Sequence, residues 1–474
     1  ANLIVQVKNN QVMRVVPLEN EDVNECWIAD RERFSYEALN GAERLTRPML
    51  KQGGEWKEVD WQTALEYVAN GLRNIQRDHG ANSIGALVSP HSTVEELYLA
   101  GALMRGLGSD NIDYRLRNAE FGAAEGVRTL GTSIASLSTL QRVLVVGSNL
   151  RKDHPLFALR VRHAVRYGAQ LNVITSPAAF SHADAWAMPV ANSVVTDAFA
   201  WAQTLADLAV AIAAEKGVPA PCAGTASAAV QAMAKSLLGG ERKALLLGNA
   251  AAHHGNASTL LALANWIGEQ TGASVGYLTE AANTVGAQWV GAQPQTGGKH
   301  AGQMLAGGLK AAVLLNTEPE FDSAAGAAAA KALGQAEMVV TLSPFKANMA
   351  FSDVLLPIAP FTETSGSFVN AEGRLQSFHA VVKPLAETRP AWKVLRVLAN
   401  LLDIPGVSFE TSQDVLARAT AQPLVASSAT RSAINLSGTT TPAPSVASIY
   451  QLDGIVRRAP SLQLTADARQ EVTP

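Results

Sequence analysis

The sequence lacks the features that mark several common classes of protein. Its 474 residues carry a formal net charge of -3, which provides no basic field for nucleic acid or for an anionic membrane. No run approaches the roughly 18 apolar residues of a membrane span, so we expect no direct span. The two cysteines, Cys26 and Cys222, stand far apart, and we expect reduced, unreactive thiols. These absences favour a cytoplasmic protein without a nucleic-acid partner.

Motifs for nucleotide, hydrolase and zinc chemistry are also absent. Gly147-Ser148-Asn149 stands where a strand gives way to a helix, but it is not G-x-G-x-x-G and no acidic residue ends the next strand. His253 and His254 have neither H-x-x-x-H spacing nor a nearby thiol, so we interpret them as polar loop residues. G-x-S-x-G and a P-loop lysine are missing as well. The sequence therefore predicts no catalytic residue and no metal site of these kinds.

Alternating strands and helices are what the sequence does contain. With 47% hydrophobic and 17% charged residues, the chain can bury a sizeable core divided into two or three lobes. Arg142–Val146 reads as a buried strand, Leu156–Arg166 as a helix and Leu171–Ile174 as the next, parallel strand. Similar strands are expected at Lys243–Leu247, Lys310–Leu315, Glu337–Leu342 and Val354–Leu356. The pattern predicts an α/β protein with mostly parallel sheets.

The two ends of the chain differ from this pattern. The residues up to about 50 read as short strands and turns, and the start at Ala1 inside a strand pattern suggests that an upstream part has been removed. Ser427–Ser448 is rich in Ser, Thr, Ala and Pro, with too little apolar content for a core of its own. We expect this tail to be a wrapping or disordered extension.

Two motifs resemble a known superfamily. Asp353–Gln376 (DVLLPIAPFTETSGSFVNAEGRLQ) is a polar loop that resembles the D-x-x-L-P…E-x-x-G-x-F-x-N-x-E-G-R-x-Q segment of molybdopterin oxidoreductases. Val145–Arg162 resembles the G-x-N-x-x-x-x-H-P turn of the same superfamily, and the two motifs stand in the family's order. Within it, Asn20–Tyr36 (NEDVNECWIADRERFSY) and Leu45–Met49 resemble the large peripheral-arm subunit of NADH:quinone oxidoreductase, which in bacteria is the G subunit.

This resemblance implies an α/β, molybdopterin-oxidoreductase-like core of two interleaved doubly wound lobes. Residues 57–140 with 306–402 would form one lobe, and 141–305 an inserted Rossmann-like lobe. Residues 1–56 would be the remnant of a small β-rich N-terminal domain, and 403–474 a C-terminal extension. Iron–sulfur clusters would be held in upstream domains that this chain does not include, since two cysteines fall short of the four thiolates that usually hold a cubane.

The departures from the family predict a chain without a cofactor. Where active members carry a Cys, selenocysteine, Ser or Asp ligand to molybdenum, Asn111–Phe121 offers only the phenol of Tyr114 after Asp113. We therefore expect no catalytic residue, no metal and no cofactor in this chain. Residues expected to face a vestigial pterin cleft are Ser148, Asn149, His154, Thr364, Ser367 and Asn370.

As a result, three functions are considered. The first is a structural part of NADH:quinone oxidoreductase, bound to other peripheral-arm subunits on the cytoplasmic face of the inner membrane. The second is an active molybdenum bis-pterin enzyme of the formate dehydrogenase or nitrate reductase type. The third is a nucleotide- or pterin-binding module without redox chemistry, which the turns at Gly147 and Gly366 permit.

Overall fold

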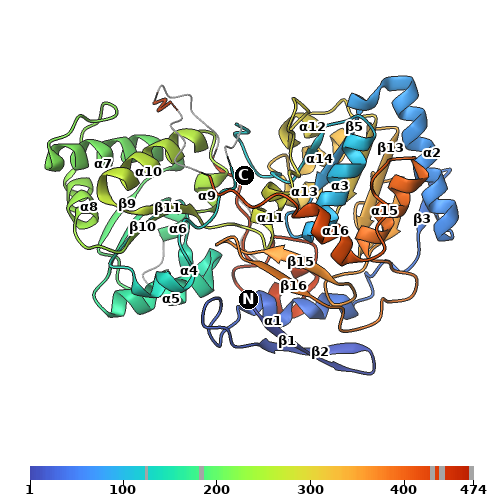
Figure 1. The fold of residues 1–474 in the computed structure, drawn as a ribbon, viewed down its shortest axis with the longest axis horizontal. Coiled ribbons are helices and arrows are strands. Elements are labelled where there is room, and N and C mark those ends of the chain that lie inside the picture. The colour runs from blue at the N-terminus through green and yellow to red at the C-terminus, as the bar shows by residue number, and fades with distance from the viewer. Residues whose placement is uncertain (123–125, 181–185, 428–432, 437–442, 469–474) are drawn as a thin grey trace.

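Two α/β lobes stand side by side, and a hairpin near the N-terminus lies below their junction (Figure 1). The computed structural model describes residues 1–122, 126–180, 186–427, 433–436 and 443–468. The α/β class and the mostly parallel sheets are confirmed. No helix among the described residues is long and apolar enough to cross a membrane.

The first lobe is built on a seven-stranded sheet in the order β4-β3-β14-β13-β12-β5-β6. Five neighbouring strands run parallel, and β3 and β4 form an antiparallel edge. Every position of β5 and β12 is buried, as expected for strands covered on both faces. The strands are β3 (Met49–Gln52), β4 (Glu55–Glu58), β5 (Ile84–Val88), β6 (Ile112–Asp113), β12 (Ala311–Leu315), β13 (Met338–Ser343) and β14 (Val354–Pro357).

Local capping signals start the long helices of this lobe. Asp60 accepts a hydrogen bond from the backbone N–H of Thr63, and Thr93 forms a capping box with Glu96. The helices are α2 (Trp61–His79), α3 (Val94–Gly106), α12 (Ala301–Leu305), α13 (Pro319–Asp322), α14 (Ala327–Leu333), α15 (Ala391–Leu401) and α16 (Ser412–Ala419).

The second lobe contains a parallel sheet in the order β11-β10-β7-β8-β9. From β7 the chain adds β8 and β9 on one side and then β10 and β11 on the other side. The position between β7 and β10 is therefore a topological switch point. Its strands are β7 (Arg142–Val146), β8 (Gln170–Thr175), β9 (Asn192–Val195), β10 (Lys243–Leu247) and β11 (Ser274–Tyr277). Its helices are α4 (Leu150–Asp153), α5 (Pro155–Arg166), α6 (Pro177–Phe180), α7 (Trp201–Lys216), α8 (Ala228–Leu238), α9 (Asn249–Ala252), α10 (Ala257–Thr271) and α11 (Thr284–Trp289).

The boundary expected at residue 56 differs from the structure. We assigned residues 1–56 to a separate N-terminal domain, yet β3 and β4 belong to the seven-stranded sheet. Leu50 pairs with Val354 and is 2% exposed, so burial of this apolar strand outweighs its proximity in sequence to the N-terminal hairpin. The remaining elements before it are β1 (Leu3–Lys8), β2 (Gln11–Pro17), α1 (Asp30–Phe34) and the short helix η1 (Ser35–Asn40).

The C-terminal part of the chain crosses the junction between the lobes. Of Ser427–Ser448, where we expected a wrapping or disordered extension, residues 428–432 and 437–442 lie outside the described residues. Residues 443–468 contain η5 (Val456–Arg458) and α17 (Pro460–Gln463) and have buried apolar side chains. A second hairpin, β15 (Gly366–Val369) and β16 (Leu375–Phe378), also lies at the junction (Figure 1).

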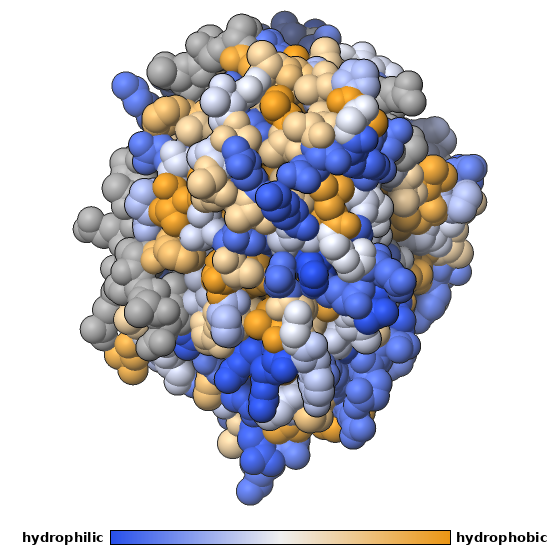
Figure 2. Space-filling view, turned by 90° about the vertical axis from the view of Figure 1, so that its left-hand side faces the viewer, coloured by the Kyte–Doolittle hydropathy of each residue, from blue (hydrophilic) through white to orange (hydrophobic). Residues whose placement is uncertain are grey.

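The outer face of the second lobe mixes apolar and polar side chains. Tyr167 and Phe199 are the most exposed large hydrophobic residues of this lobe, at 82% and 61%. On the face that Figure 2 shows, apolar side chains are dispersed among charged ones. Single exposed hydrophobic residues of this kind are normal on a globular surface.

Candidate functional site

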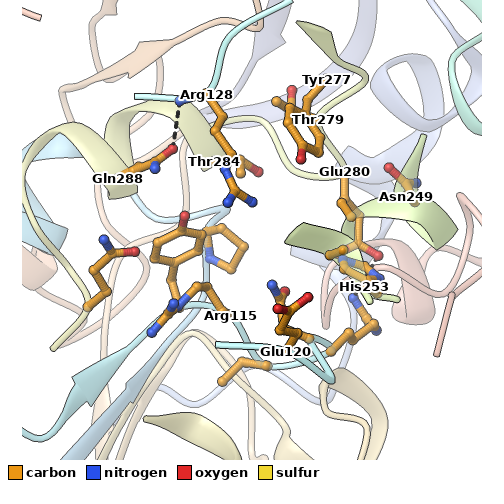
Figure 3. A pocket seen from close by; sticks show the side chains of 18 of the residues that line it. Arg115, Glu120, Arg128, Asn249, His253, Tyr277, Thr279, Glu280, Thr284 and Gln288 are labelled. Carbon is orange, nitrogen blue, oxygen red and sulfur yellow. Dashed lines mark hydrogen bonds and ion pairs between the residues drawn. The ribbon is translucent and has the colours of Figure 1, made fainter. Parts of the chain in front are cut away.

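A cavity of about 130 Å³ lies between the lobes, where loops after strands of both sheets meet. Ligands of α/β proteins bind at this place, outside the carboxyl ends of parallel strands. The volume accommodates about ten water molecules. Residues from the loops after β5, β6, β10 and β11 surround it (Figure 3), and the polar ones include His91, Tyr114, Arg115, Arg117, Glu120, Arg128, Asn249, His253, Tyr277, Thr279 and Glu280.

Arg117, Glu280 and Asp322, three of the charged residues that line this cavity, are paired with one another. Arg117 lies 3.1 Å from Glu280 and 3.7 Å from Asp322, and all three side chains are almost fully buried. Burial raises the pKa of Glu280, but Arg117 and nearby histidines outweigh it and leave that pKa below its usual value. Burial lowers the pKa of His253. A neutral His253 therefore faces an ionised Glu280, whose charge Arg117 balances.

At the switch point of the second lobe, the carboxylate of Asp153 accepts the hydrogen bonds of the turn after β7. Asp153 Oδ2 accepts hydrogen bonds from the Ser148 hydroxyl at 2.6 Å and from the Asn149 backbone N–H at 3.1 Å. Gly147 permits this turn because its φ is +67° and a Cβ would lie 2.7 Å from the backbone nitrogen of Ala251. Burial is the main cause that raises the pKa of Asp153 to about 6.

The turn after β12 in the first lobe has the same arrangement. Asp322 Oδ2 accepts hydrogen bonds from the Glu318 backbone N–H at 2.7 Å and from the Thr317 hydroxyl at 3.3 Å. In both lobes the aspartate stands five residues after the hydroxyl residue. Backbone N–H groups at such turns are the donors that bind phosphates in α/β proteins. In each of these two turns, a backbone N–H donates instead to an aspartate of the same chain, Asp153 or Asp322.

His154 lies buried beside the first of these turns. Its ring stacks on Phe157 with centroids 5.8 Å apart, and its Nε2 has no well-aligned hydrogen-bond partner among the described residues. Burial is the main cause that lowers the pKa of His154 to about 3, while Asn249 acts weakly in the opposite direction. His154 is therefore a neutral, packed side chain at neutral pH.

The segment Asp353–Gln376 connects distant parts of the fold. Glu363 forms a buried bidentate ion pair with Arg44, with contacts of 2.7 and 2.9 Å. The Ser367 backbone N–H donates to Glu95, and Glu372 accepts from the backbone N–H of Ile134. These contacts connect the segment to three places: the N-terminal segment (residues 1–48), α3, and the residues just before the second lobe. We therefore call Asp353–Gln376 the hub segment.

The structure places the predicted cleft residues in two groups, neither of which lies among the described residues that line the cavity. Ser148, Asn149 and His154 come together at the turn after β7. Along the second hairpin, Thr364 donates to the carbonyl of Ser365, Ser367 contacts Ser377, and Asn370 accepts from the backbone of Glu372 and Arg374. These contacts of the hairpin residues are all internal to the chain.

Sequence reasoning missed most of the cavity wall. Tyr277 ends β11, a short strand that we did not predict, and Thr279 and Glu280 follow it. His253 and His254 lie in a turn after α9, as predicted for loop residues, but they are 7% and 0% exposed, and the sequence did not indicate this burial. Their rings contact the carbonyls of Ser445 and Ala198, which no local pattern could place. The described residues contain no cluster of potential metal ligands.

Tyr114 is the residue at the position where the resemblance predicts a metal ligand. Burial is the main cause that raises the pKa of Tyr114 to about 12, so its phenol is neutral at neutral pH. The preceding Asp113 is fully buried and accepts hydrogen bonds from Arg115 and from the backbone N–H of Ala301. No anionic side chain in Asp113–Arg115 is left free to bind a metal.

Comparison with known proteins finds relatives of two kinds, named as subunits of NADH oxidoreductases and as formate dehydrogenases. The sequence resembles the NADH-ubiquinone oxidoreductase 75 kDa subunit of Reclinomonas americana, with 24% identity over 86% of this chain and 57% of that protein. The NADH-quinone oxidoreductase G subunit of Rickettsia typhi is 25% identical over 88% of this chain and 56% of that protein. A putative formate dehydrogenase of Staphylococcus aureus is 26% identical over 84% and 47%. The chain thus spans about half the length of these relatives.

Family and fold comparisons agree. The fold matches acetylene hydratase from Pelobacter acetylenicus with a TM-score of 0.66 and 14% identity, over 89% of this chain and 70% of that one. Residues 1–37 match the NADH-ubiquinone oxidoreductase NDSU1/NuoG-like 4Fe-4S domain. Residues 44–401, well over half of the chain, match the sequence model of molybdopterin oxidoreductase. The chain therefore belongs to the molybdopterin oxidoreductase family.

Proposed function

We propose that this chain is a cofactor-free structural part of an NADH:quinone oxidoreductase. The observation that carries the proposal is that Asp153 and Asp322 occupy the hydrogen-bond donors at the turns of both lobes. A phosphate of a pterin cofactor would have to displace these carboxylates and would meet their charge. Under this proposal the chain keeps the fold of the family, while the hydrogen-bond donors at the two turns stabilise the protein itself and bind no cofactor.

The residues present do not fit a molybdenum bis-pterin centre. The position of the expected metal ligand offers the neutral phenol of Tyr114. The cavity beside it has room for about ten water molecules, and Leu452 and Ser427 from the C-terminal part of the chain form part of its wall. Two pterins and a metal would need this part to move away.

An iron–sulfur cluster does not fit the residues of this chain either. Residues 1–37 match a 4Fe-4S domain, but they contain a single cysteine, the exposed Cys26. The other cysteine, Cys222, belongs to the second lobe. A cubane is usually held by four cysteine thiolates, which two distant thiols cannot supply.

The names of the relatives support the assignment to the complex. Proteins named as the NADH-ubiquinone oxidoreductase 75 kDa subunit and as the NADH-quinone oxidoreductase G subunit match along most of this chain. Under the proposal, its partners are other peripheral-arm subunits, and it lies on the cytoplasmic side of the inner membrane through them. It would hold the geometry of an electron path whose clusters lie elsewhere, and contribute no reacting group.

The relatives named formate dehydrogenase favour an alternative, an active molybdenum enzyme. Metal and pterin content decides between the two. We expect chain purified from a metal-replete host to contain molybdenum, tungsten, iron and fluorescent pterin far below stoichiometric amounts. One molybdenum with two pterins per chain would overturn the proposal. Thermal shift with guanine nucleotides and pterins tests a non-redox binding module, and we expect no stabilisation.

Replacement of Tyr114, the residue at the position expected for a metal ligand, tests the proposal directly in the assembled complex. Tyr114→Phe removes the phenol and keeps the ring, so we expect unchanged NADH:quinone activity in membranes of a strain that carries only the variant. By contrast, Arg44→Met should reduce the amount of assembled complex while each remaining complex keeps its rate. Loss of activity in Tyr114→Phe at normal complex levels contradicts a structural role.

A further inference from the structure

Residues 443–468, the C-terminal clasp, contact three separate parts of the protein. Asp467 accepts a hydrogen bond from Lys152 of the second lobe at 2.6 Å. The Ser461 hydroxyl donates to Glu37 of the N-terminal segment at 2.6 Å. The third part is the first lobe, where Arg457 Nη1 lies 2.7 Å from Asp322. The clasp therefore bridges both lobes and the N-terminal segment.

The clasp contributes an apolar cluster of its own. Its buried cluster consists of Ala447, Ile449, Leu452, Val456, Ala459 and Leu462, all from the clasp itself. Phe34 is the outside residue that packs against this cluster, and Ile455 reaches a small neighbouring cluster around Phe345. Because the clasp carries its own small core, its attachment to the lobes depends mainly on polar contacts.

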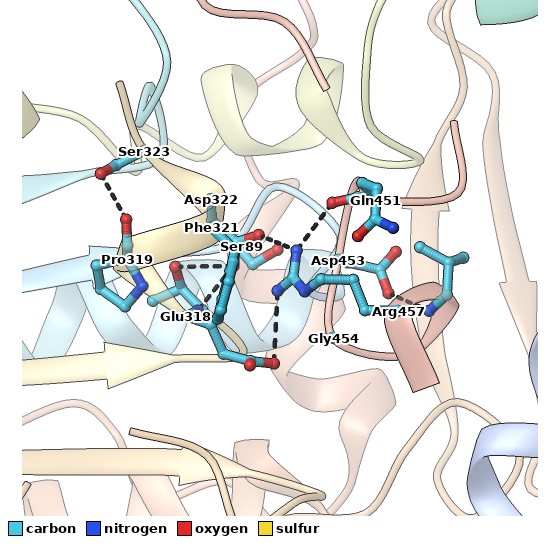
Figure 4. A network of polar contacts seen from close by, with 12 residues as sticks. Ser89, Glu318, Pro319, Phe321, Asp322, Ser323, Gln451, Asp453, Gly454 and Arg457 are labelled. Carbon is cyan, nitrogen blue, oxygen red and sulfur yellow. Dashed lines mark hydrogen bonds and ion pairs between the residues drawn. The ribbon is translucent and has the colours of Figure 1, made fainter. Parts of the chain in front are cut away.

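The strongest of these contacts form a network at the turn after β12 (Figure 4). Arg457 contacts Asp322 at 2.7 Å and Glu318 at 3.4 Å, and Arg458 lies 2.6 Å from Glu318. Arg458 also pairs with Glu43 at 2.7 Å. Without the two arginines, Glu318 and Asp322 would be two nearby buried carboxylates, and the arginine that remains in range among the described residues is Arg117, 3.7 Å from Asp322.

The same segment forms part of the wall of the cavity. Leu452 lines it, and the carbonyl of Ser445 lies 2.8 Å from Nδ1 of His253. Asp453 lies 3.7 Å from His91, a further lining residue. Departure of the clasp would remove these groups and expose the cavity to solvent.

We propose that residues 443–468 are a releasable ionic clasp that holds the two lobes in one orientation and covers the cavity between them. Loss of its ion pairs releases the clasp as a unit, while both lobes stay folded on their own cores. Release opens the cavity to small molecules. The clasp is defined by contacts within the chain alone, so it does not depend on the function proposed above.

Hydrogen exchange of the Arg457→Gln/Arg458→Gln variant tests the release. We expect the amides of residues 443–468 to exchange roughly tenfold faster or more, while β7, β10, β12 and β13 keep their protection. Arg73→Gln is the matched control, because Arg73 forms an exposed ion pair with Asp403 and should change nothing here.

A buried thiol reports on the cavity. Ala257 lines the cavity and is 4% exposed, so Ala257→Cys in a Cys26→Ser/Cys222→Ser background places a single reactive group there. We expect this thiol to react slowly with a maleimide, and roughly tenfold faster or more when the two arginines are replaced. The Arg73→Gln change should leave the rate unaltered.

Three results would overturn the proposal. The clasp amides could stay protected in the double variant, which would mean that the ion pairs do not hold it. All amides could exchange together, which would make the segment an inseparable part of the core. Fast exchange of the clasp without faster reaction of the thiol would show that the clasp does not cover the cavity.

Discussion

Arg44→Met is expected to lower the free energy of unfolding by about 3–5 kcal/mol, because it leaves the buried carboxylate of Glu363 without its cation. The two side chains are 3% and 5% exposed and form a bidentate pair across 319 positions of sequence. Arg44 also donates to the carbonyls of Pro344 and Leu39. The loss would loosen the N-terminal segment from the hub segment, and urea unfolding, fitted to each transition, measures it.

The neighbouring Arg47 offers a matched control. Its side chain is 54% exposed and pairs with Glu58 and Glu387 on the surface, so Arg47→Met should lower the free energy of unfolding far less than Arg44→Met does. Arg44→Met/Glu363→Gln should recover part of the loss, because no unpaired charge then remains. Equal losses in Arg44→Met and Arg47→Met would show that the buried pair has no special role.

A second large effect concerns acid. The pKa of His154 is about 3 in the folded protein, below the ordinary value of 6.5, so the unfolded chain takes up a proton first as the pH falls. Stability contributed by the neutral ring is therefore lost progressively below pH 6.5, by about 2 kcal/mol between pH 6.5 and 4.5. His154→Gln should lack this loss.

The adjacent Asp153 acts in the opposite direction. Its pKa of about 6 lies above the ordinary value, so the folded protein takes up this proton first and gains about 2 kcal/mol as the pH falls from 6 to 4.5. Asp153→Asn should therefore lose more stability in acid than the unmodified protein, and His154→Gln less. His163→Gln is the control, because His163 is an exposed residue of the helix α5 that follows His154. Parallel pH profiles for all variants would contradict the assignment.

The strands and helices with strong local patterns could be predicted from the sequence. Arg142–Val146 and Lys243–Leu247 were predicted with the bounds that the structure has, because short aliphatic runs between turn residues are local signals. β9 and β11 were missed, since Asn192–Val195 and Ser274–Tyr277 are short and only partly apolar. The resemblance to a family supplied the interleaving of the lobes, which local patterns do not contain.

The candidate site was predicted less well, for a physical reason. Hydrogen bonds such as that from Thr93 to Glu96 involve residues three apart, and the sequence displays them. The contact of His253 with Ser445 and that of Arg457 with Asp322 join positions 192 and 135 apart. Burial of these polar groups depends on segments that fold onto them from elsewhere. The low-complexity composition of Ser427–Ser448 also concealed the regular apolar spacing that follows it.

The interleaving of the lobes has a consequence for synthesis on the ribosome. All five strands of the second lobe lie between Arg142 and Tyr277, so this lobe can be completed from one continuous stretch of nascent chain. In the first lobe, β5 pairs with β12, and the partners Ile84 and Ala311 stand on either side of that whole stretch. Until translation passes β12, β5 therefore lacks one of its two partner strands and the first sheet stays incomplete. During that interval the nascent first lobe is the part of the chain most in need of a chaperone.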